Sequence, residues 1–220
     1  MKMILASNNA KKLRELKEIL SDMGIELCSL REAGCNFEVE ETGTTFAENA
    51  YLKAAAVVEA TGVAAIADDS GLMVDALNGE PGVYSARYAP GGHDASDKEK
   101  YEYLLKKLEG VENRRAKFVS SICCIFPNGD IIRCEGECTG KILLSPRGEG
   151  GFGYDPVFMP AGYDKSMAEL GTEVKNEISH RANALKIFKK KLREYNGTDK
   201  EAEGTAQRAC HDRGYDNPDR

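Results

Sequence analysis

Two adjacent carboxylates, Asp68 and Asp69, are candidates for chemistry in this chain of 220 residues. They follow an apolar run at residues 63–67 that is predicted to be a buried strand. Successive strand residues point to opposite faces, so the two carboxylates are expected to have different tasks. Carboxylates at the end of such a strand are costly unless paired, exposed or metal-bound, and their oxygens suit a hard cation such as Mg²⁺. Glu40 and Glu41 offer further ligands, although an acidic surface turn would leave the same pattern.

A polar segment between a predicted strand at residues 3–6 and a predicted helix has the features of an anion site. Its residues are Ser7, Asn8, Asn9, Ala10, Lys11 and Lys12. Free backbone N–H groups and the helix dipole attract anions at a helix N-terminus, and either lysine adds a point charge. The segment lacks the glycines of a Walker P-loop. Taken alone this pattern is a weak signal, and a capped helix with solvated lysines is the structural alternative.

Two later segments offer groups that recognise a base. A glycine-rich loop carries the residues Gly150, Gly151, Phe152, Gly153, Tyr154, Asp155 and Pro156. Glycines let the backbone approach a ligand closely, and the aromatic rings provide a stacking surface. Before the predicted last helix, the segment at residues 175–181 carries Lys175, His180 and Arg181. A mobile loop anchored by its aromatics and a helix start with solvated charges are the structural alternatives. Together, anion donors, a metal site, a stacking loop and a base-reading arginine point to a nucleoside triphosphate.

These candidates must be positioned by alternating strands and helices. Strands are predicted at residues 3–6, 25–30, 63–67 and 72–77, and a hairpin at 116–126 and 131–144 with bulges near Gly136 and Gly140. Predicted helices follow residue 9, follow Thr44 or Thr45 with Glu48 completing a capping box, run from Ser96 to 108, and close the domain. This order predicts an α/β fold with a long mixed sheet. The domain is expected to span residues 1–195, with 196–220 as a disordered tail.

Composition narrows the class of protein. Hydrophobic residues make up 41% of the chain and the formal net charge is −6, which is typical of a globular protein and argues against non-specific binding to nucleic acid. No signal peptide or membrane-spanning segment is predicted. Seven cysteines without zinc-site spacing are expected to be free thiols in a reducing cytoplasm.

Five blocks of the sequence resemble the inosine triphosphate pyrophosphatase family, which removes nonstandard purine nucleoside triphosphates. They lie between residue 3 and about residue 195 and read SNNAKKLRELKEIL, EETGTTFAENAYLKA, AIADDSGLMVDALNGEPGVYSARY, GGFGYDPVF and EISHRANAL. The family's first block often reads Thr-Gly-Asn where this chain has Ser7, Asn8 and Asn9. Asn8 tolerates left-handed geometry, so the turn is expected to survive.

The resemblance implies two lobes around a substrate cleft, a homodimer, and hydrolysis of the triphosphate to monophosphate and pyrophosphate with Mg²⁺. It implies that Ser7 to Lys12 hold the triphosphate and that Glu41 and Asp69 serve the metal, with Asp69 also accepting a proton. Ser70 and Lys175 would contact the substrate. The base end would be formed by Phe152, Gly153, Tyr154, Asp155, His180 and Arg181. The roles of Glu40 and Asp68 stay open.

Two other functions remain as alternatives. A related pyrophosphatase for pyrimidine or methylated triphosphates would share the fold, but Phe152 and the pair His180–Arg181 favour a purine. A catalytically silent nucleotide-binding module would have no need of intact Glu41 and Asp69. An assay of phosphate released from a panel of triphosphates, with added inorganic pyrophosphatase, separates the three.

Overall fold

The structure is a computed structural model that describes residues 1–211, with side chains through residue 197. One sheet and five α-helices organise this part of the chain, in the order β1 (Lys2–Leu5), α1 (Ala10–Ile19), β2 (Glu26–Ser29), α2 (Phe46–Thr61), β3 (Ala65–Val74), α3 (Asp97–Lys107), β4 (Arg115–Ile125), β5 (Ile131–Ile142), β6 (Phe158–Pro160), α4 (Gly171–Ile178) and α5 (His180–His211). Short 3₁₀ turns connect them, of which η3 (Gly82–Arg87) matters most for the site.

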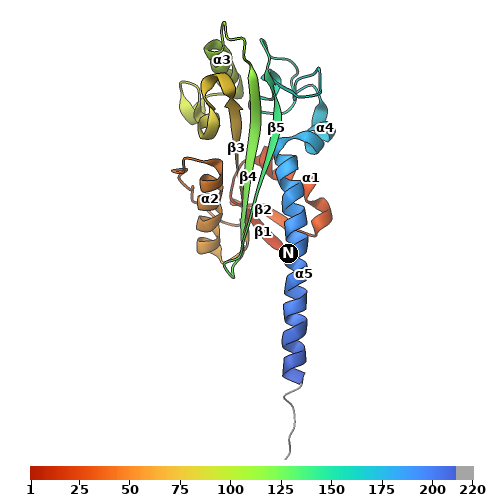
Figure 1. The fold of residues 1–220 in the computed structure, drawn as a ribbon. Helices are drawn as coiled ribbons and strands as arrows, with labels where there is room; N and C mark the ends of the chain where they lie inside the picture. The colour runs from red at the N-terminus through yellow and green to blue at the C-terminus, as the bar shows by residue number, and fades with distance from the viewer. Residues whose placement is uncertain (212–220) are drawn as a thin grey trace, which may run out of the picture.

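The sheet is mixed, as the sequence predicts. Its six strands follow the order β2-β1-β3-β4-β5-β6. Strand β1 runs parallel to β2 and β3, whereas β3, β4, β5 and β6 are successively antiparallel. The long strands β3, β4 and β5 run through the body of the molecule and join two lobes, with α1, α2 and α5 around the lower lobe and α3 at the upper lobe (Figure 1).

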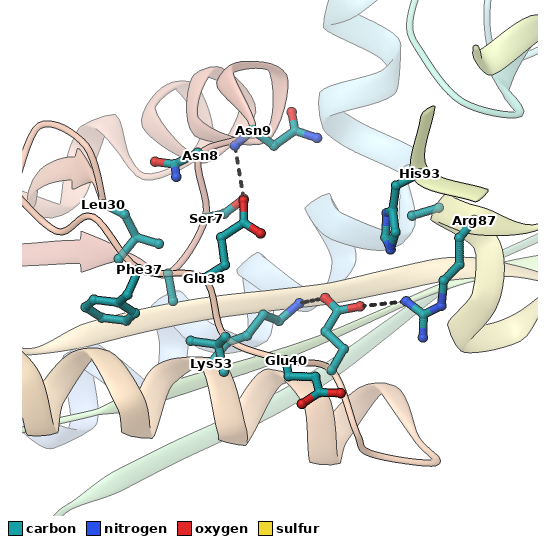
Figure 2. A pocket seen from close by; sticks show the side chains of 14 residues that line it. Ser7, Asn8, Asn9, Leu30, Phe37, Glu38, Glu40, Lys53, Arg87 and His93 are labelled. Carbon is teal, nitrogen blue, oxygen red and sulfur yellow. Dashed lines mark hydrogen bonds and ion pairs between the residues drawn. The ribbon is translucent and has the colours of Figure 1, made fainter. Parts of the chain in front are cut away.

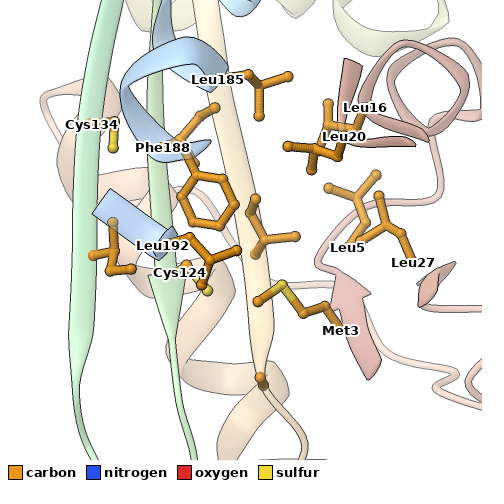
Figure 3. Packing of buried hydrophobic residues seen from close by; sticks show 14 of the residues in the cluster. Met3, Leu5, Leu16, Leu20, Leu27, Cys124, Cys134, Leu185, Phe188 and Leu192 are labelled. Atoms are coloured by element: carbon orange, nitrogen blue, oxygen red, sulfur yellow. The ribbon is translucent and has the colours of Figure 1, made fainter. Parts of the chain in front are cut away.

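Alternation along the strands sorts the core of the lower lobe into two layers. On one face, Met3, Leu5 and Ile66 pack with the apolar sides of α1 and α5 (Figure 3). On the other face, alternate residues such as Ala65 and Ala67 pack against α2. Because side chains alternate at a period of two, the even positions of β3 face α5 and the odd positions face α2. This parity decides where Asp68 and Asp69 point.

The second lobe has its own apolar cluster. Leu72 and Val74 of β3 pack there with Leu104 of α3 and with residues of β4 and β6. Helix α3 begins with the expected capping box, in which Ser96 and Glu99 bond each other's backbone N–H groups. The predicted box of Thr45 and Glu48 at the start of α2 is present as well. The caps therefore fix the starts of both helices.

Two predictions about the sheet are wrong. Residues 63–67 and 72–77 do not form separate strands, because β3 runs without a break from Ala65 to Val74 and pairs with β4 along its whole length. Strand β5 has no bulge at Gly136 or Gly140, since its ladder with β4 is continuous. A Cβ at Gly136 would lie 2.8 Å from Cα of Ala184 and closer still to the backbone of α5. These glycines therefore mark close approach of another backbone rather than a bulge.

Helix α5 continues past the predicted domain boundary. Residues 196–211 extend this helix, where irregular structure was expected, and residues 212–220 of the predicted tail lie outside the described residues. The helix projects beyond the body of the molecule (Figure 1). Within residues 1–211, no helix combines the length and the apolar character that crossing a membrane requires.

Candidate active site

The site forms where β1 ends beside the longer strand β3. Pairing between the two strands stops at Leu5 and Ile66, and the chain then turns away through Ser7 into α1. Beyond that point the edge of β3 faces lysines instead of a neighbouring strand. The backbone carbonyl of Asp68 accepts hydrogen bonds from Nζ of Lys12 at 3.1 Å and Nζ of Lys53 at 3.3 Å. One carbonyl thus holds a cation from α1 and a cation from α2.

Asp68 points toward α5 and is fully paired there. Its carboxylate contacts Nζ of Lys12 at 3.0 Å and Nη2 of Arg181 at 2.9 Å, and accepts the hydroxyl of Ser120 at 2.6 Å. Burial alone would raise the pKa of Asp68, but the charges of Arg181 and Lys12 outweigh it and hold the pKa well below its ordinary value. Asp68 is therefore a permanent anion that positions two cations and is unsuited to accepting a proton.

Asp69 points toward α2 and has different surroundings. It contacts Nζ of Lys53 at 2.7 Å and accepts the Asn49 side-chain amide at 3.3 Å. Burial raises the pKa of Asp69 above its ordinary value, even though Lys53 opposes this. The expectation that the adjacent carboxylates have different tasks is matched by their opposite pKa shifts. Of the two, Asp69 is the one that can take up a proton.

Glu41 joins Asp69 at the same ammonium group. Its Oε1 lies 2.9 Å from Nζ of Lys53, and its Oε2 accepts Nη1 of Arg87 at 3.3 Å. Burial would raise the pKa of Glu41, but Lys53 outweighs it and the pKa is lowered. Two carboxylates from separate segments, Glu41 and Asp69, therefore converge on the ammonium group of Lys53.

This donor set fits Mg²⁺. Magnesium is usually bound by one or two carboxylates together with substrate phosphates and water, and not by a closed protein cage. Within residues 1–197, no group of three or more His, Cys, Asp or Glu side chains could hold a metal by itself. Glu41 and Asp69 would supply two ligands and leave the remaining positions to oxygens of a ligand.

A cavity of about 840 Å³ opens beside Glu41 and Lys53, which both line it. Ser7, Asn8 and Asn9 line one wall, and Figure 2 shows Lys53 and Arg87 approaching a carboxylate from opposite sides, which the distances identify as Glu41. Asn9 caps α1 by accepting the N–H groups of Lys11 and Lys12, and its own N–H donates to Ser7. Three backbone N–H groups of the predicted anion site thus already donate within the segment. Much of the positive charge around the cavity therefore comes from lysine and arginine side chains.

A second cavity of about 200 Å³ adjoins the first, because Asn9 and Ala86 line both. It brings together all the residues predicted for the base end, namely Phe152, Gly153, Tyr154, Asp155, His180 and Arg181. Ser70 and Lys175, predicted to contact substrate, line it too, and so does Lys12, which was predicted to hold the triphosphate. The ring of Phe152 lies 4.2 Å from Nζ of Lys175 and 5.4 Å from Nζ of Lys11. An aromatic plane beside a cavity of this size suits a stacked base.

Arg181 lies in the first turn of α5, and most of its N–H groups donate to other residues of the protein. Nε and Nη2 donate to Asp68, Nη1 donates to Glu15, and Nη2 also donates to Ser70 at 3.0 Å. Burial would lower the pKa of Arg181, but the two carboxylates outweigh it and raise the pKa. A guanidinium has five N–H groups. Four hydrogen bonds therefore leave Arg181 one donor for a ligand.

His180 has a buried nitrogen without a partner. Its ring stacks on Phe118 with centroids 4.8 Å apart, and Nδ1 is the one buried side-chain N or O atom through residue 197 that makes no hydrogen bond. Burial, assisted by the charge of Arg181, holds the pKa of His180 well below its ordinary value. The imidazole is therefore neutral, and Nδ1 has an unused capacity for a hydrogen bond in a residue that lines the smaller cavity.

Tyr154 and Asp155 hold the loop in shape. The hydroxyl of Tyr154 donates to the carbonyl of Ser85 at 2.9 Å. The carboxylate of Asp155 accepts the N–H of Phe152 at 2.8 Å and Nζ of Lys175 at 2.7 Å. Burial raises the pKa of Asp155, against the opposing charge of Lys175. Their side chains thus fix Phe152 and Lys175 beside the cavity.

Four residues of the site were missing from the sequence prediction: Glu15, Asn49, Lys53 and Arg87. A signal existed for two of them. Asn49 and Lys53 fall on the buried stripe of α2 beside Phe46, Ala50, Ala54 and Val57, where a polar side chain needs a partner. Glu15 follows Lys12 by about one turn of α1 and reaches Lys175 at 3.0 Å. Nothing in the local pattern marks Arg87, because its position depends on how η3 packs.

The chain is similar to known proteins over most of its length. The model of the Ham1 family matches residues 3–191. A dITP/XTP pyrophosphatase of Aquifex aeolicus is 50% identical over 193 residues, covering 84% of this chain and 94% of the relative. A dITP/XTP pyrophosphatase of Bacillus subtilis is 48% identical over 191 residues, covering 86% and 96%.

Solved structures show the same fold. The Ham1 protein of Staphylococcus aureus superposes with a TM-score of 0.80 at 44% identity, covering 89% of this chain and 100% of that chain. A HAM1 protein from Coxiella burnetii gives a TM-score of 0.80 at 41% identity, covering 88% and 99%. The fold class and the family resemblance predicted from the sequence are confirmed. The chain belongs to the Ham1 family.

Proposed function

We propose that this protein hydrolyses nonstandard purine nucleoside triphosphates, namely ITP, dITP and XTP, to the monophosphate and pyrophosphate. The observation that carries the proposal is the pair of adjoining cavities, one with Phe152, His180 and Arg181 for a base, the other with Glu41 and Lys53 for phosphates. The names of relatives about half identical to this chain support the same reaction.

Glu41 and Asp69 would hold Mg²⁺ in the active enzyme. Bound Mg²⁺ neutralises charge on phosphate oxygens and on the pyrophosphate that leaves. The protein's own cations act in the same sense, since Lys12 and Lys53 lie at the edge of β3 between the two cavities. Asp69 orients water and accepts its proton, which its raised pKa favours.

The smaller cavity supplies base selection. Inosine and xanthosine carry a 6-oxo group, which accepts a hydrogen bond, whereas adenosine carries a 6-amino group, which donates. Arg181 has only donors, and its one uncommitted N–H would face an acceptor favourably. Guanosine shares the 6-oxo group, so its rejection must depend on its 2-amino group and on other residues of the cavity.

A panel assay tests the proposal. Phosphate release is measured from ITP, XTP, GTP, ATP and dTTP with added inorganic pyrophosphatase, and the same reactions without it show whether pyrophosphate is the product. ITP and XTP should be turned over fastest, and EDTA should abolish turnover until Mg²⁺ is added in excess. Preference for a pyrimidine triphosphate would support the related pyrophosphatase, and binding of ITP without turnover would support a silent module.

We also propose that the protein is a cytoplasmic homodimer and does not act on nucleic acid. The family resemblance supports the dimer, and the net charge of −6 argues against a broad nucleic-acid face. Light scattering coupled to size exclusion tests the dimer, and a mass of one chain at micromolar concentration would contradict it.

A further inference from the structure

We propose that Arg87 binds the distal phosphates of the substrate and stabilises the pyrophosphate as it leaves. This inference rests on the proposed function and names a residue that binds the distal phosphates of the triphosphate. It starts from the place of Arg87 in the larger cavity, where its guanidinium faces the carboxylate of Glu41 (Figure 2).

The segment that carries Arg87 is firmly held. Arg87 is the last residue of η3, and Ser85 two residues earlier ties this turn to β3 by accepting the N–H of Leu72 at 2.9 Å. The Ser85 hydroxyl donates to the carbonyl of Gly82 at 2.6 Å, and the Ser85 carbonyl accepts the hydroxyl of Tyr154. The backbone at Arg87 is thus fixed relative to both β3 and the glycine-rich loop.

The order of residues along η3 gives the direction of the substrate. Ser85 lines the smaller cavity, Ala86 lines both, and Arg87 lines the larger one. A nucleotide with its base beside Phe152 would pass between Asn9 and Ala86, the two residues shared by the cavities. Its phosphates then extend toward Arg87, so the β- and γ-phosphates are the groups that this guanidinium meets.

Arg87 has donors to spare for these phosphates. Its side chain is 25% exposed, and Nη1 makes a hydrogen bond of 3.3 Å to Glu41. The guanidinium carbon lies 5.1 Å from the centre of the Tyr84 ring, which supports one face of the group. Within residues 1–197, this guanidinium makes no other hydrogen bond. An arginine fork with free N–H groups matches the spacing of phosphate oxygens.

The other cations near the carboxylates are more heavily engaged. Lys53 contacts Glu41, Asp69 and the carbonyl of Asp68. Glu38 and Glu40 add negative charge to the cavity wall. A polyphosphate entering this cavity needs positive charge at its far end, and Arg87 is placed to supply it.

Hydrolysis of the triphosphate needs water as its second reactant. The oxygen of water bonds to the α-phosphorus while the bond from that phosphorus to the bridging oxygen breaks. The electron pair of the broken bond stays on the pyrophosphate, and Asp69 takes the proton of water. Arg87 contacts the group on which this charge develops, so its removal should affect pyrophosphate more than monophosphate.

The alternative is that Arg87 only holds Glu41 in place through their ion pair. The test compares Arg87→Gln and Arg87→Lys with Arg133→Gln. Arg133 is a matched control because its guanidinium also lies 5.1 Å from a tyrosine ring, that of Tyr51, outside the two cavities. Binding of pyrophosphate and of IMP is measured by calorimetry in Mg²⁺ buffer, with their inhibition of ITP hydrolysis and the melting temperature.

Arg87→Gln should weaken pyrophosphate binding about tenfold or more, the effect of losing a charge-assisted hydrogen bond, and leave IMP binding unchanged. The pyrophosphate affinity of Arg87→Lys should lie between those of Arg87→Gln and wild type. If Arg87→Gln folds poorly, Arg87→Lys replaces it in the comparison. Equal effects on both ligands, or none on pyrophosphate, would overturn the proposal. Failure of wild type to release pyrophosphate from ITP or XTP would instead refute the proposed function, while the binding comparison still judges Arg87.

Discussion

Neighbouring residues on one strand divide the work of the site. Asp68 is locked as an anion between Arg181 and Lys12, whereas Asp69 has a raised pKa and shares Lys53 with Glu41. The contrast arises from the alternation of a strand, because the two side chains lie on opposite faces of the sheet. The roles of the pair can therefore be tested separately.

Replacing Asp69 by asparagine should abolish most catalysis with little change in fold. The amide keeps the size of the side chain but cannot accept the proton of water, and turnover of ITP should fall at least about 100-fold. The measurement is steady-state turnover together with a melting curve. Near-normal turnover would remove Asp69 from the mechanism.

Replacing Arg181 by lysine should narrow the preference for a 6-oxo purine. Lysine keeps the charge that Asp68 and Glu15 require but lacks the planar fork. Losing a hydrogen bond to the base should lower kcat/KM for ITP by about tenfold or more, and for ATP much less. If ITP, XTP, GTP and ATP lose efficiency equally, Arg181 serves the phosphates or the fold and does not read the base.

His180 should make folding stability depend on pH. Its pKa is depressed in the folded protein, so below about pH 6.5, the ordinary value, the unfolded chain binds a proton that the folded chain does not. Stability should therefore fall as the pH drops through this range, by up to about 1.4 kcal/mol per pH unit for one proton. Urea unfolding at several pH values measures this, and His180→Gln should flatten the slope. An equal slope in both proteins would show that other groups dominate.

At the scale of elements, α5 packs closely against strand β5. Gly136 of β5 lies against the backbone of α5 at Ala184, which leaves no space for a methyl group. Gly136→Ala should lower the free energy of unfolding by about 1–3 kcal/mol through overpacking. Gly197→Ala is the control, because this glycine of α5 has no atom within 4 Å of an added Cβ. It should be neutral or stabilise by up to about 1 kcal/mol.

Local sequence patterns predicted which helices and strands form, but they predicted less well where each of them ends. The box of Thr45 and Glu48 and the cap at Ser96 are fully local features, so the starts of α2 and α3 could be predicted. The predicted strand ends at the polar pair Asp68–Asp69, whereas β3 continues through both residues to Val74. Their partners Lys12, Lys53 and Arg181 come from three different helices, and no local pattern shows that they meet at β3.

At the scale of the whole molecule, truncations within α5 test the predicted domain boundary at residue 195. Tyr195 stacks on Phe126 at 4.3 Å and its hydroxyl accepts the amide of Asn128 at 3.1 Å. Truncation after Tyr195 keeps these contacts and should leave ITP turnover and melting temperature nearly unchanged. Truncation after Lys191 also removes Leu192, which is 1% exposed, and should lower the melting temperature clearly. A large loss already in the longer variant would show that residues beyond Tyr195 belong to the domain.

Because β3 and β4 pair without a break, the site should not tolerate an insertion or deletion inside β3. Loops between elements can gain or lose residues while the sheet stays in register. One residue inserted within β3 before Asp68 would exchange the two carboxylates between faces, placing the locked anion at Lys53 and the proton acceptor at Arg181. Asp68 holds the arginine that selects the base, and Asp69 accepts the proton during cleavage of the phosphate. A single peptide bond separates these two residues. Length variation among homologues should therefore be found in the loops and be absent from this strand.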